Sequence, residues 1–418
     1  MAVVKFRNPN HPNSEYEDWE EEEDKDDEGF IDEQIEENER SKERRMEIVR
    51  LFLRCLVVAF ILLLIGLFFR YLNSKRVYSV ALSEKIYEMS LQDNVTCVSL
   101  GDSLVYYSKD GATCLNGSGS VLWSISFEMQ DPLVSKAGDL IAIGDYGGST
   151  VYLESESEVL GTIDTNLPLL DLCVSENGEV AAVLSDTDTI WIYLFNSEGE
   201  TIAYIKTTMS QSGYPLCVSL SPNGELLCVS HLTADSAGLS SSIAFYNFGE
   251  VGQNYAENNV SGFNYEDEVF PYTRFMNSST CVAVSDSRIV FYTGKEIPQS
   301  GSNAMFDEEL EGVYGSDDYV ALLFPDSSGS EEYCLQVYDT SGQMTAEIPF
   351  TMEYTGIQVA GENVYINNDT DLLIYTVSGQ LRYDGTLPAT ASQVVALGQS
   401  VDRFYLVTED AIEKVTLQ

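Results

Sequence analysis

The feature that most constrains the fold of this 418-residue chain is a short unit that recurs from residue 77 onward. Each copy is a turn, usually with glycine, followed by a short apolar run typical of a β-strand, as at residues 137–143, 177–183 and 223–229. Further copies begin near Gly101, Asn277, Gly315, Gly361 and Gly398, and neighbouring copies are 37 to about 54 residues apart. A period near 40 residues in all-β sequence is the signature of propeller blades, each a four-stranded sheet.

The number of copies predicts the number of blades. Eight anchors indicate an eight-bladed β-propeller, and seven blades is the alternative. A second hairpin is expected in each interval, with turns at Gly199, Gly342 and Gly379. The segment after Gly398 is too short for four strands, so we expect residues 77–82 to supply the missing one. Such closure would leave no unprotected sheet edge at the ends of the ring.

A single apolar segment precedes the repeats. Residues 51–69 carry one charge, Arg54, and their nineteen residues are about enough to cross a ~30 Å hydrocarbon core. Basic residues, Arg70 and Arg76 among them, follow where a signal peptide would have its small-residue cleavage site. The sequence therefore predicts a retained transmembrane helix within a juxtamembrane and membrane-spanning region, residues 41–73.

The residues before this helix predict a disordered acidic tail, residues 1–40. Sixteen acidic residues and one lysine lie within residues 15–39. The few apolar residues among them cannot bury enough surface to offset the entropy lost on ordering the chain. The tail is either simply solvated or a recruitment arm. Lys and Arg favour the N-terminal flank of the span by six to four, which predicts a cytoplasmic tail and an extracytoplasmic domain, residues 74–418.

The predicted propeller is strongly acidic, with 49 acidic and 10 basic residues from residue 77 onward. Binding of nucleic acid by a basic surface is disfavoured, because neutralising phosphates requires clustered Lys and Arg. An acidic surface suits solubility, attraction of cations or a basic partner.

Seven cysteines lie in the repeats and show no metal-binding spacing. Most sit in apolar runs, where a free cysteine behaves as a small buried side chain. Cys217 and Cys228 flank the turn at residues 221–224, so a disulfide across that hairpin is one alternative. The odd number of cysteines argues against a complete disulfide framework.

Two segments resemble known propeller blades. The run from Leu115 to Trp123 is similar to the glycine turn and tryptophan of quinoprotein-like (PQQ-like) blades, and residues 221–230 resemble the hairpin of YVTN and WD40-type blades. The whole layout resembles a family of membrane-anchored bacterial propellers of unknown function. The tryptophan is not repeated in most units, so a quinone cofactor is not implied.

Candidate sites are few. His231 is the single histidine of the repeats, which leaves little basis for a histidine metal cluster or a catalytic triad. Oxygen-rich turns at residues 186–188, 285–287 and 367–371 are candidates for calcium, although such turns are also ordinary punctuation. We assign no catalytic or cofactor-binding residue and expect no cofactor, with calcium as the one open metal.

The longest interval, residues 224–278, is where we look first for specificity, because propeller loops vary on a rigid scaffold, and a flexible insertion without a binding role is the alternative. It contains Tyr255, Phe263 and Tyr265. The leading hypothesis is a non-catalytic scaffold anchored in the lipid bilayer that binds an envelope protein or polysaccharide. The alternatives are a surface-glycan hydrolase or lyase that uses acidic residues on the propeller face, and a transmembrane sensor.

Overall fold

The computed structural model describes residue 45 and residues 49–66, 76–88, 95–209, 212–234, 238–326, 329, 331–397 and 400–418. It divides into two units, Met1–Ser74 and Lys75–Gln418. In the first unit, the helix Val49–Gly66 is long and apolar enough to cross a membrane, a property that a membrane anchor and a signal sequence share. The predicted acidic tail, residues 1–40, and residues 67–69 of the predicted span lie outside the described residues.

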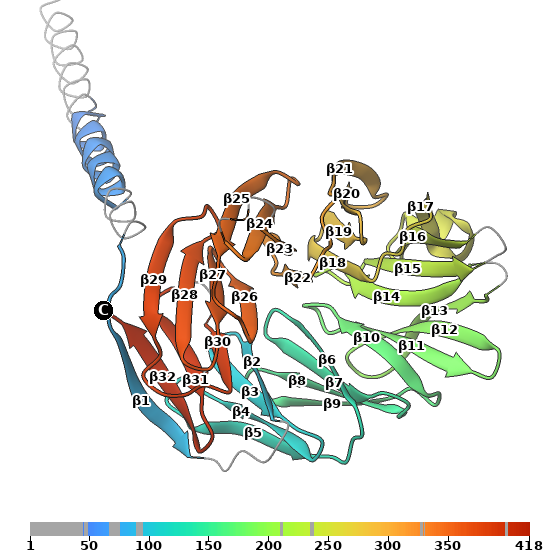
Figure 1. Ribbon diagram of the computed structural model, residues 1–418. Helices are drawn as coiled ribbons and strands as arrows, with labels where there is room; N and C mark the ends of the chain where they lie inside the picture. The colour runs from blue at the N-terminus through green and yellow to red at the C-terminus, as the bar shows by residue number, and fades with distance from the viewer. Residues whose placement is uncertain are drawn as a thin grey trace, which may run out of the picture. The chain divides into compact units, whose positions relative to one another are not determined.

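The second unit is an eight-bladed β-propeller, as the repeat predicted (Figure 1). Each blade is a four-stranded antiparallel sheet, and we number the blades from the first complete sheet in the chain. Blade 1 contains β2 (Thr96–Leu100), β3 (Ser103–Tyr107), β4 (Gly111–Leu115) and β5 (Val121–Ser126). Blade 2 contains β6 (Pro132–Ala137), β7 (Leu140–Asp145), β8 (Thr150–Ser155) and β9 (Val159–Asp164). Blade 3 contains β10 (Leu169–Val174), β11 (Val180–Asp186), β12 (Thr189–Phe195) and β13 (Thr201–Thr207).

The remaining blades follow the same order from the centre of the ring outward. Blade 4 contains β14 (Tyr214–Leu220), β15 (Leu226–Ala234), β16 (Leu239–Asn247) and β17 (Asn259–Glu266). Blade 5 contains β18 (Tyr272–Asn277), β19 (Thr280–Val284), β20 (Arg288–Thr293) and β21 (Gln299–Met305). Blade 6 contains β22 (Gly312–Gly315), β23 (Tyr319–Pro325), β24 (Tyr333–Asp339) and β25 (Met344–Phe350). Blade 7 contains β26 (Gly356–Ala360), β27 (Asn363–Asn367), β28 (Asp371–Thr376) and β29 (Leu381–Thr386). Blade 8 contains β30 (Gln393–Ala396), β31 (Arg403–Val407), β32 (Ala411–Leu417) and β1 (Ala81–Glu88).

The recurring turns connect the first and second strands of the blades. Gly101, Gly138 and Gly361 occupy these turns with φ of +57°, +56° and +53°, a left-handed conformation that glycine adopts without a steric penalty. The eighth predicted anchor, Gly398, lies outside the described residues, between β30 and β31.

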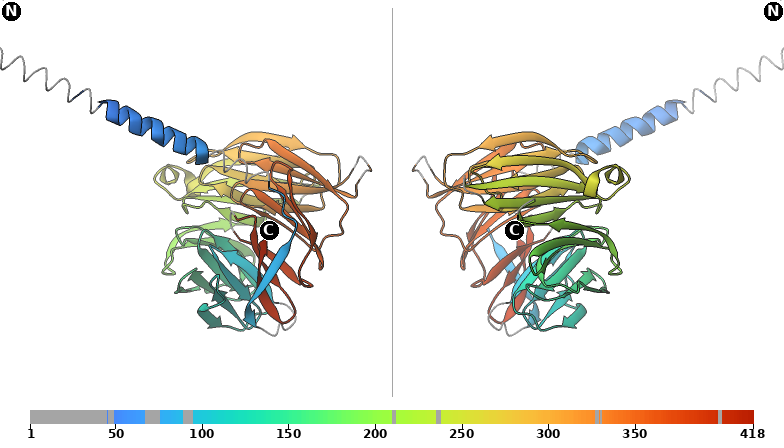
Figure 2. Two further views of the ribbon diagram at one scale, coloured as in Figure 1. Left: turned by 90° about the vertical axis from the view of Figure 1, so that its left-hand side faces the viewer. Right: turned by 90° about the vertical axis from the view of Figure 1, so that its right-hand side faces the viewer.

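The ring is closed by the N-terminal strand, as predicted, but the strand lies later in the chain. β1 pairs antiparallel with β32 from Ala81 opposite Leu417 to Glu88 opposite Ala411, and the two lie side by side in Figures 1 and 2. Residues 77–80 precede the strand. Tyr78 is nonetheless buried, and its backbone nitrogen donates to the carbonyl oxygen of Arg382 at 2.8 Å. Tyr78 is the one apolar residue of this run that is buried, whereas Val77, Val80 and Leu82 are exposed.

The hydrophobic core lies between the blades. One cluster of buried side chains fills each of the eight joints between neighbouring blades, from the joint of blades 8 and 1 around to that of blades 7 and 8. Middle strands are therefore covered on both faces, which explains continuous apolar runs such as residues 140–143 and 180–184. These joints, rather than one central core, are where burial stabilises the fold.

The innermost strands surround a central channel. They approach each other more closely at six joints than at β2–β6, between blades 1 and 2, and at β18–β22, between blades 5 and 6. Because strands alternate in direction, the turns between first and second strands and between third and fourth strands all lie at one end of the ring. We call this end the hairpin face and the opposite end the connection face.

Candidate functional site

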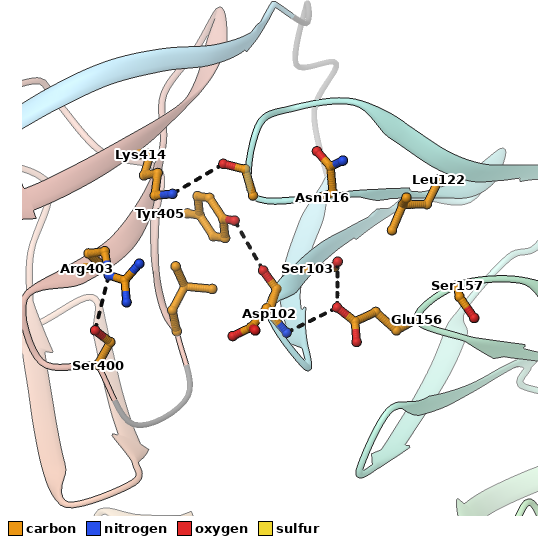
Figure 3. Close-up of a pocket in the computed structure, with 12 residues that line it drawn as sticks. Asp102, Ser103, Asn116, Leu122, Glu156, Ser157, Ser400, Arg403, Tyr405 and Lys414 are labelled. Carbon is orange, nitrogen blue, oxygen red and sulfur yellow. Dashed lines mark hydrogen bonds between the residues drawn. The ribbon is translucent and has the colours of Figure 1, made fainter.

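A pocket of about 750 Å³ opens on the hairpin face, where blades 8, 1 and 2 meet (Figure 3). We call it the rim pocket. It is lined by turns of three blades and by strands of blade 8: Asp102, Ser103, Asn116, Gly117, Leu122, Glu156, Ser157, Leu397, Ser400, Arg403, Tyr405 and Lys414. Its volume lies within the range of small-molecule and peptide sites.

One wall of the rim pocket is acidic. Glu156, from the β8–β9 turn of blade 2, accepts hydrogen bonds from the Ser103 hydroxyl at 2.8 Å and from the Asp102 backbone nitrogen at 3.2 Å (Figure 3). A side chain at Gly101 would collide with the Glu156 carboxylate. Glycine at this turn therefore permits both the left-handed backbone and the approach of Glu156 from the next blade.

The facing wall is basic and belongs to blade 8. The Lys414 ammonium donates to the carbonyl oxygen of Gly117 at 3.4 Å, and Arg403 Nε donates to the Ser400 hydroxyl at 3.3 Å. Between the walls, the Tyr405 hydroxyl donates to the carbonyl oxygen of Asp102 at 3.5 Å. Burial raises the pKa of Tyr405, so this phenol remains a neutral donor near neutral pH.

Opposite charges on facing walls determine what the rim pocket can do chemically. A ligand with paired positive and negative groups would place each beside a partner of opposite sign, whereas a ligand with one kind of charge would meet one repulsive wall. Leu122 and Leu397 add apolar surface. The arrangement fits recognition of a polar chain segment.

A second polar feature lines the central channel. Gln393 of blade 8 accepts a hydrogen bond from the Cys97 backbone nitrogen at 2.9 Å and donates to the Cys97 carbonyl oxygen at 2.7 Å. Gln358 of blade 7 makes the same pair of bonds to Ala396 and Val394, at 3.0 and 3.1 Å. An amide carries both a donor and an acceptor, so each glutamine satisfies both backbone groups on the exposed edge of the next innermost strand. We call these the amide bridges.

At the two wider joints, cations take the place of the amides. Lys136 of blade 2 donates to the Ser99 carbonyl oxygen at 2.9 Å and to the Ser99 hydroxyl at 3.2 Å. Arg274 of blade 5 donates through Nε to the Ser316 carbonyl oxygen at 3.1 Å and through a terminal nitrogen to Asp317 at 2.7 Å. We call these the cationic bridges. Longer side chains reach across the larger separation, but they can only donate.

His231, the one histidine singled out from the sequence, lies in the interior. It is 1% exposed in β15, opposite Pro215 and Ser242, and neither ring nitrogen has a hydrogen-bond partner among the described residues. Burial lowers the pKa of His231 to about 4, so the ring is neutral at physiological pH. It lines neither the rim pocket nor the cavities of the central channel.

The three oxygen-rich turns connect second and third strands, as the sequence suggested, and lie on the connection face. In two of them, side chains are engaged in the turn itself: Asn368 accepts from the backbone nitrogens of Thr370 and Asp371, and the Ser285 hydroxyl accepts from those of Ser287 and Arg288. Among the described residues, no three His, Cys, Asp or Glu side chains gather in a metal-binding group. Calcium binding stays a prediction.

The long interval of blade 4 contains an ordered loop on the hairpin face. It carries two short 3-10 helices, η1 (Gly252–Asn254) and η2 (Ala256–Asn258), and Asn258 donates to the Asn247 carbonyl oxygen at 3.0 Å. Tyr255 belongs to this loop and is exposed. Phe263 and Tyr265 lie instead in β17 and pack against the core between blades 4 and 5.

The two cysteines with the spacing for a disulfide are both free thiols. A bulge between Pro215 and Cys217 shifts the register, so Cys217 lies opposite Ser230 and Cys228 lies opposite Ser219. Burial raises the pKa of the Cys217 thiol to about 12, which leaves it protonated and unreactive near neutral pH.

Sequence reasoning missed the rim pocket and the cationic bridges. The walls of the rim pocket come from residues about 300 positions apart, such as Asp102 and Tyr405, and Lys136 and Arg274 come from blades 2 and 5, which do not adjoin in the ring. The scarcity of cations was the available signal, because only 10 basic residues follow residue 76 and four of them line these cavities.

Solved propellers share the fold at low sequence identity. Sqt1 from Saccharomyces cerevisiae is 10% identical, with a TM-score of 0.51 over 82% of this chain and 99% of that one. BamB from Moraxella catarrhalis is 12% identical, with a TM-score of 0.46 over 80% and 97%. The Pan2 WD40 domain from Neurospora crassa is 10% identical, with a TM-score of 0.40 over 68% and 88%. These likenesses concern the fold alone.

No curated protein matches this chain in sequence. A family model does match, and it covers residues 74–417, the whole propeller. The resemblance to a propeller family of unknown function is thereby confirmed. The chain belongs to the family of unknown function DUF5711.

Proposed function

We propose that this protein is a membrane-anchored, extracytoplasmic binding scaffold whose hairpin face receives a segment of a protein partner. The observation that carries the proposal is the rim pocket. In this pocket of about 750 Å³, Glu156 and Asp102 face Arg403 and Lys414. Proteins present acidic and basic side chains close together along one segment, and such a segment complements both walls.

The geometry of the pocket favours a chain segment over a compact ligand. Its lining comes from turns of blades 1, 2 and 8 and from strands of blade 8, so it lies where three rigid sheets meet. Leu122 is 41% exposed and provides an apolar contact of the kind found at the centre of protein interfaces. Rigid walls also reduce the entropy lost on binding.

Anchoring and orientation rest on the first unit and on the sequence. The helix Val49–Gly66 has the length and composition of a membrane span. The excess of Lys and Arg on its N-terminal side supports a cytoplasmic N-terminus and an outward-facing propeller. Treating intact cells with a protease tests this arrangement. If the propeller faces outward, it is degraded while the cytoplasmic tail is protected.

Site-specific photocrosslinking of the full-length protein in its native membrane tests the function. A photoreactive amino acid at Leu122, in the rim pocket, should give a discrete adduct with one protein. The same group at Tyr146, exposed in a turn of the connection face, is the matched control and should give none. Arg403→Glu should remove the Leu122 adduct, because it makes both walls acidic.

Equal adducts at Leu122 and Tyr146, or an adduct unchanged by Arg403→Glu, would contradict the proposal. The other hypotheses are separate outcomes. Turnover of a cell-surface polysaccharide by the full-length protein, with or without calcium, would replace the scaffold with a hydrolase or lyase. A ligand-dependent change in protease cleavage of the tail would indicate a sensor.

A further inference from the structure

Two cavities lie along the central channel. The larger, about 510 Å³, is lined by the innermost strands of blades 1, 2, 5, 6, 7 and 8. The smaller, about 190 Å³, is lined mainly by blades 2 to 5. Lys136, Ala137, Arg274 and Asp317 line both. The two cationic bridges therefore lie between the cavities, at the channel end near the hairpin face.

Both cations keep donors beyond the hydrogen bonds that they make. The Lys136 ammonium has three N–H donors, and its two hydrogen bonds both go to Ser99. Arg274 has five donors, of which one bonds Ser316 and one bonds Asp317. Its side chain is 32% exposed, so the guanidinium borders the cavity. An oxyanion between the two side chains could accept from each of them without breaking these bonds.

The charges around the larger cavity sum to an excess of one positive charge. Among the described residues that line it, Lys136, Arg274 and Asp317 are the only Lys, Arg, Asp or Glu side chains. Lys136 is exposed to the channel yet surrounded by protein, and this burial, followed by the nearby Arg274 charge, lowers the pKa of Lys136. The two cations thus repel each other, which an anion between them would relieve.

We propose that the larger channel cavity binds a small oxyanion, a carboxylate or phosphate compound, held between Lys136 and Arg274. Arg presents a planar fork that pairs with two oxygens, and Lys adds a compact charge. Asp317 lines the same cavity and orients the guanidinium by accepting a hydrogen bond from it. The cavity is large enough for a polyvalent anion such as citrate as well as for phosphate.

The acidic surface of the propeller opposes this binding only weakly. Among the acidic residues that the structure describes in the propeller, Glu154 alone is buried, and charges farther apart than a Debye length of about 8 Å are largely screened at physiological salt. Contacts inside the channel act over about 3 Å in a less polar setting and are screened much less.

Titration calorimetry of the full-length protein in detergent tests the inference, with inorganic phosphate and citrate as probes in a chloride buffer of fixed ionic strength. One site per chain is expected. Lys136→Gln and Arg274→Gln should each weaken binding by about tenfold or more, since each removes a charge-assisted hydrogen bond. Lys109→Gln, in an exposed turn of the connection face, is the matched control and should leave the affinity unchanged.

Asp317→Asn provides a test that does not depend on losing a contact. Asparagine can still accept from Arg274, but the opposing charge is gone, so both probes should bind about threefold or more tightly. The tighter probe identifies the ligand as a carboxylate or a phosphate. Absence of binding to the wild-type protein, or an affinity unchanged in Lys136→Gln and not raised in Asp317→Asn, would overturn the inference. The crosslinking result at Leu122 is independent of either outcome.

Discussion

The joint between blades 8 and 1 and the joint between blades 1 and 2 adjoin the same sheet but are bridged differently. At the first, the amide of Gln393 bonds both backbone groups of Cys97, and the innermost strands lie close together. At the second, Lys136 reaches across a wider gap and only donates, to Ser99. The same contrast separates Gln358, between blades 7 and 8, from Arg274, between blades 5 and 6.

Closing the ring and binding a ligand are therefore functions of different joints. A glutamine amide that bonds one donor and one acceptor keeps one N–H and one lone pair, but it carries no charge with which to attract an ionic ligand. A cation that bonds one carbonyl group keeps donors and an unbalanced charge. We therefore assign structural closure to the amide bridges and ligand binding to the cationic bridges, while the hydrophobic clusters hold both kinds of joint.

A cavity in the hydrophobic cluster between blades 1 and 2 should destabilise the protein most, if that cluster holds the wide joint together. Ile141 is fully buried in the cluster between blades 1 and 2. Ile141→Ala should lower the free energy of unfolding by about 2–5 kcal/mol, because it leaves a cavity that rigid sheets cannot fill. Denaturant unfolding of the full-length protein measures this, with Ile141→Val, expected to cost about 1 kcal/mol, as the control. A loss below that of Ile141→Val would show a loosely packed joint.

The next effect concerns a buried carboxyl group at the same wide joint. Glu154 lies opposite Ile141 in the sheet and is 0% exposed. Burial raises the pKa of Glu154 to about 7. A raised folded-state pKa contributes stability below the unfolded value, near 4.5, and this contribution is lost as the pH rises through 7.

Glu154→Gln should remove that loss. Between about pH 5 and pH 8, the wild-type protein should lose about 2 kcal/mol more than the variant does, since each pKa unit corresponds to about 1.4 kcal/mol. Unfolding curves of both proteins at the two pH values measure this difference in the free energy of unfolding. Other titrating groups contribute equally to both proteins and cancel. An identical pH dependence for both proteins would mean that Glu154 is solvated.

The opposite pH dependence of stability is expected from His231, at the joint between blades 3 and 4, where the innermost strands lie close together. His231 lies on the face of β15 that packs toward blade 3, and burial lowers its pKa to about 4. A lowered histidine pKa contributes stability above the unfolded value, near 6.5, that is lost as the pH falls toward 4. On going from about pH 7.5 to about pH 4.5, the free energy of unfolding of the wild-type protein should fall by about 2 kcal/mol more than that of His231→Leu. Equal acid sensitivity would place the loss elsewhere.

The fold was predictable because its determinants are local and repeated. Glycine turns such as those at Gly101 and Gly138 mark the blades by their backbone conformation, and they recur whatever side chains surround them. The closing strand was harder to place. Tyr78 is apolar and buried but outside the sheet, whereas β1 is an outer strand with polar residues such as Glu84 and Lys85. Its pairing with β32 satisfies backbone groups, which leave little trace in the sequence.

The candidate sites were not predictable for a complementary reason. Lys136 and Arg274 face one cavity because the ring places blades 2 and 5 across the channel from each other, and no periodicity encodes that encounter. The run Leu153-Glu-Ser looks in the sequence like the end of a strand leading into a polar turn, where Glu154 would be exposed. Glu154 is nevertheless fully buried. Conversely, Phe263 and Tyr265 looked like loop residues because polar residues surround them, although alternation in β17 directs them to the core.

The most direct test of the division between amide and cationic bridges compares the unfolding free energies of Gln393→Ala and Lys136→Gln in the full-length protein. Gln393→Ala should cost about 1–3 kcal/mol, because it leaves the Cys97 nitrogen and oxygen without partners. Gln299→Ala, at an exposed glutamine, controls for the loss of an amide and should cost less than about 0.5 kcal/mol. Lys136→Gln should also stay within about 0.5 kcal/mol, because its side chain is exposed to the channel. A cost for Lys136→Gln equal to or greater than that for Gln393→Ala would mean that the cation closes the ring, and would contradict the account.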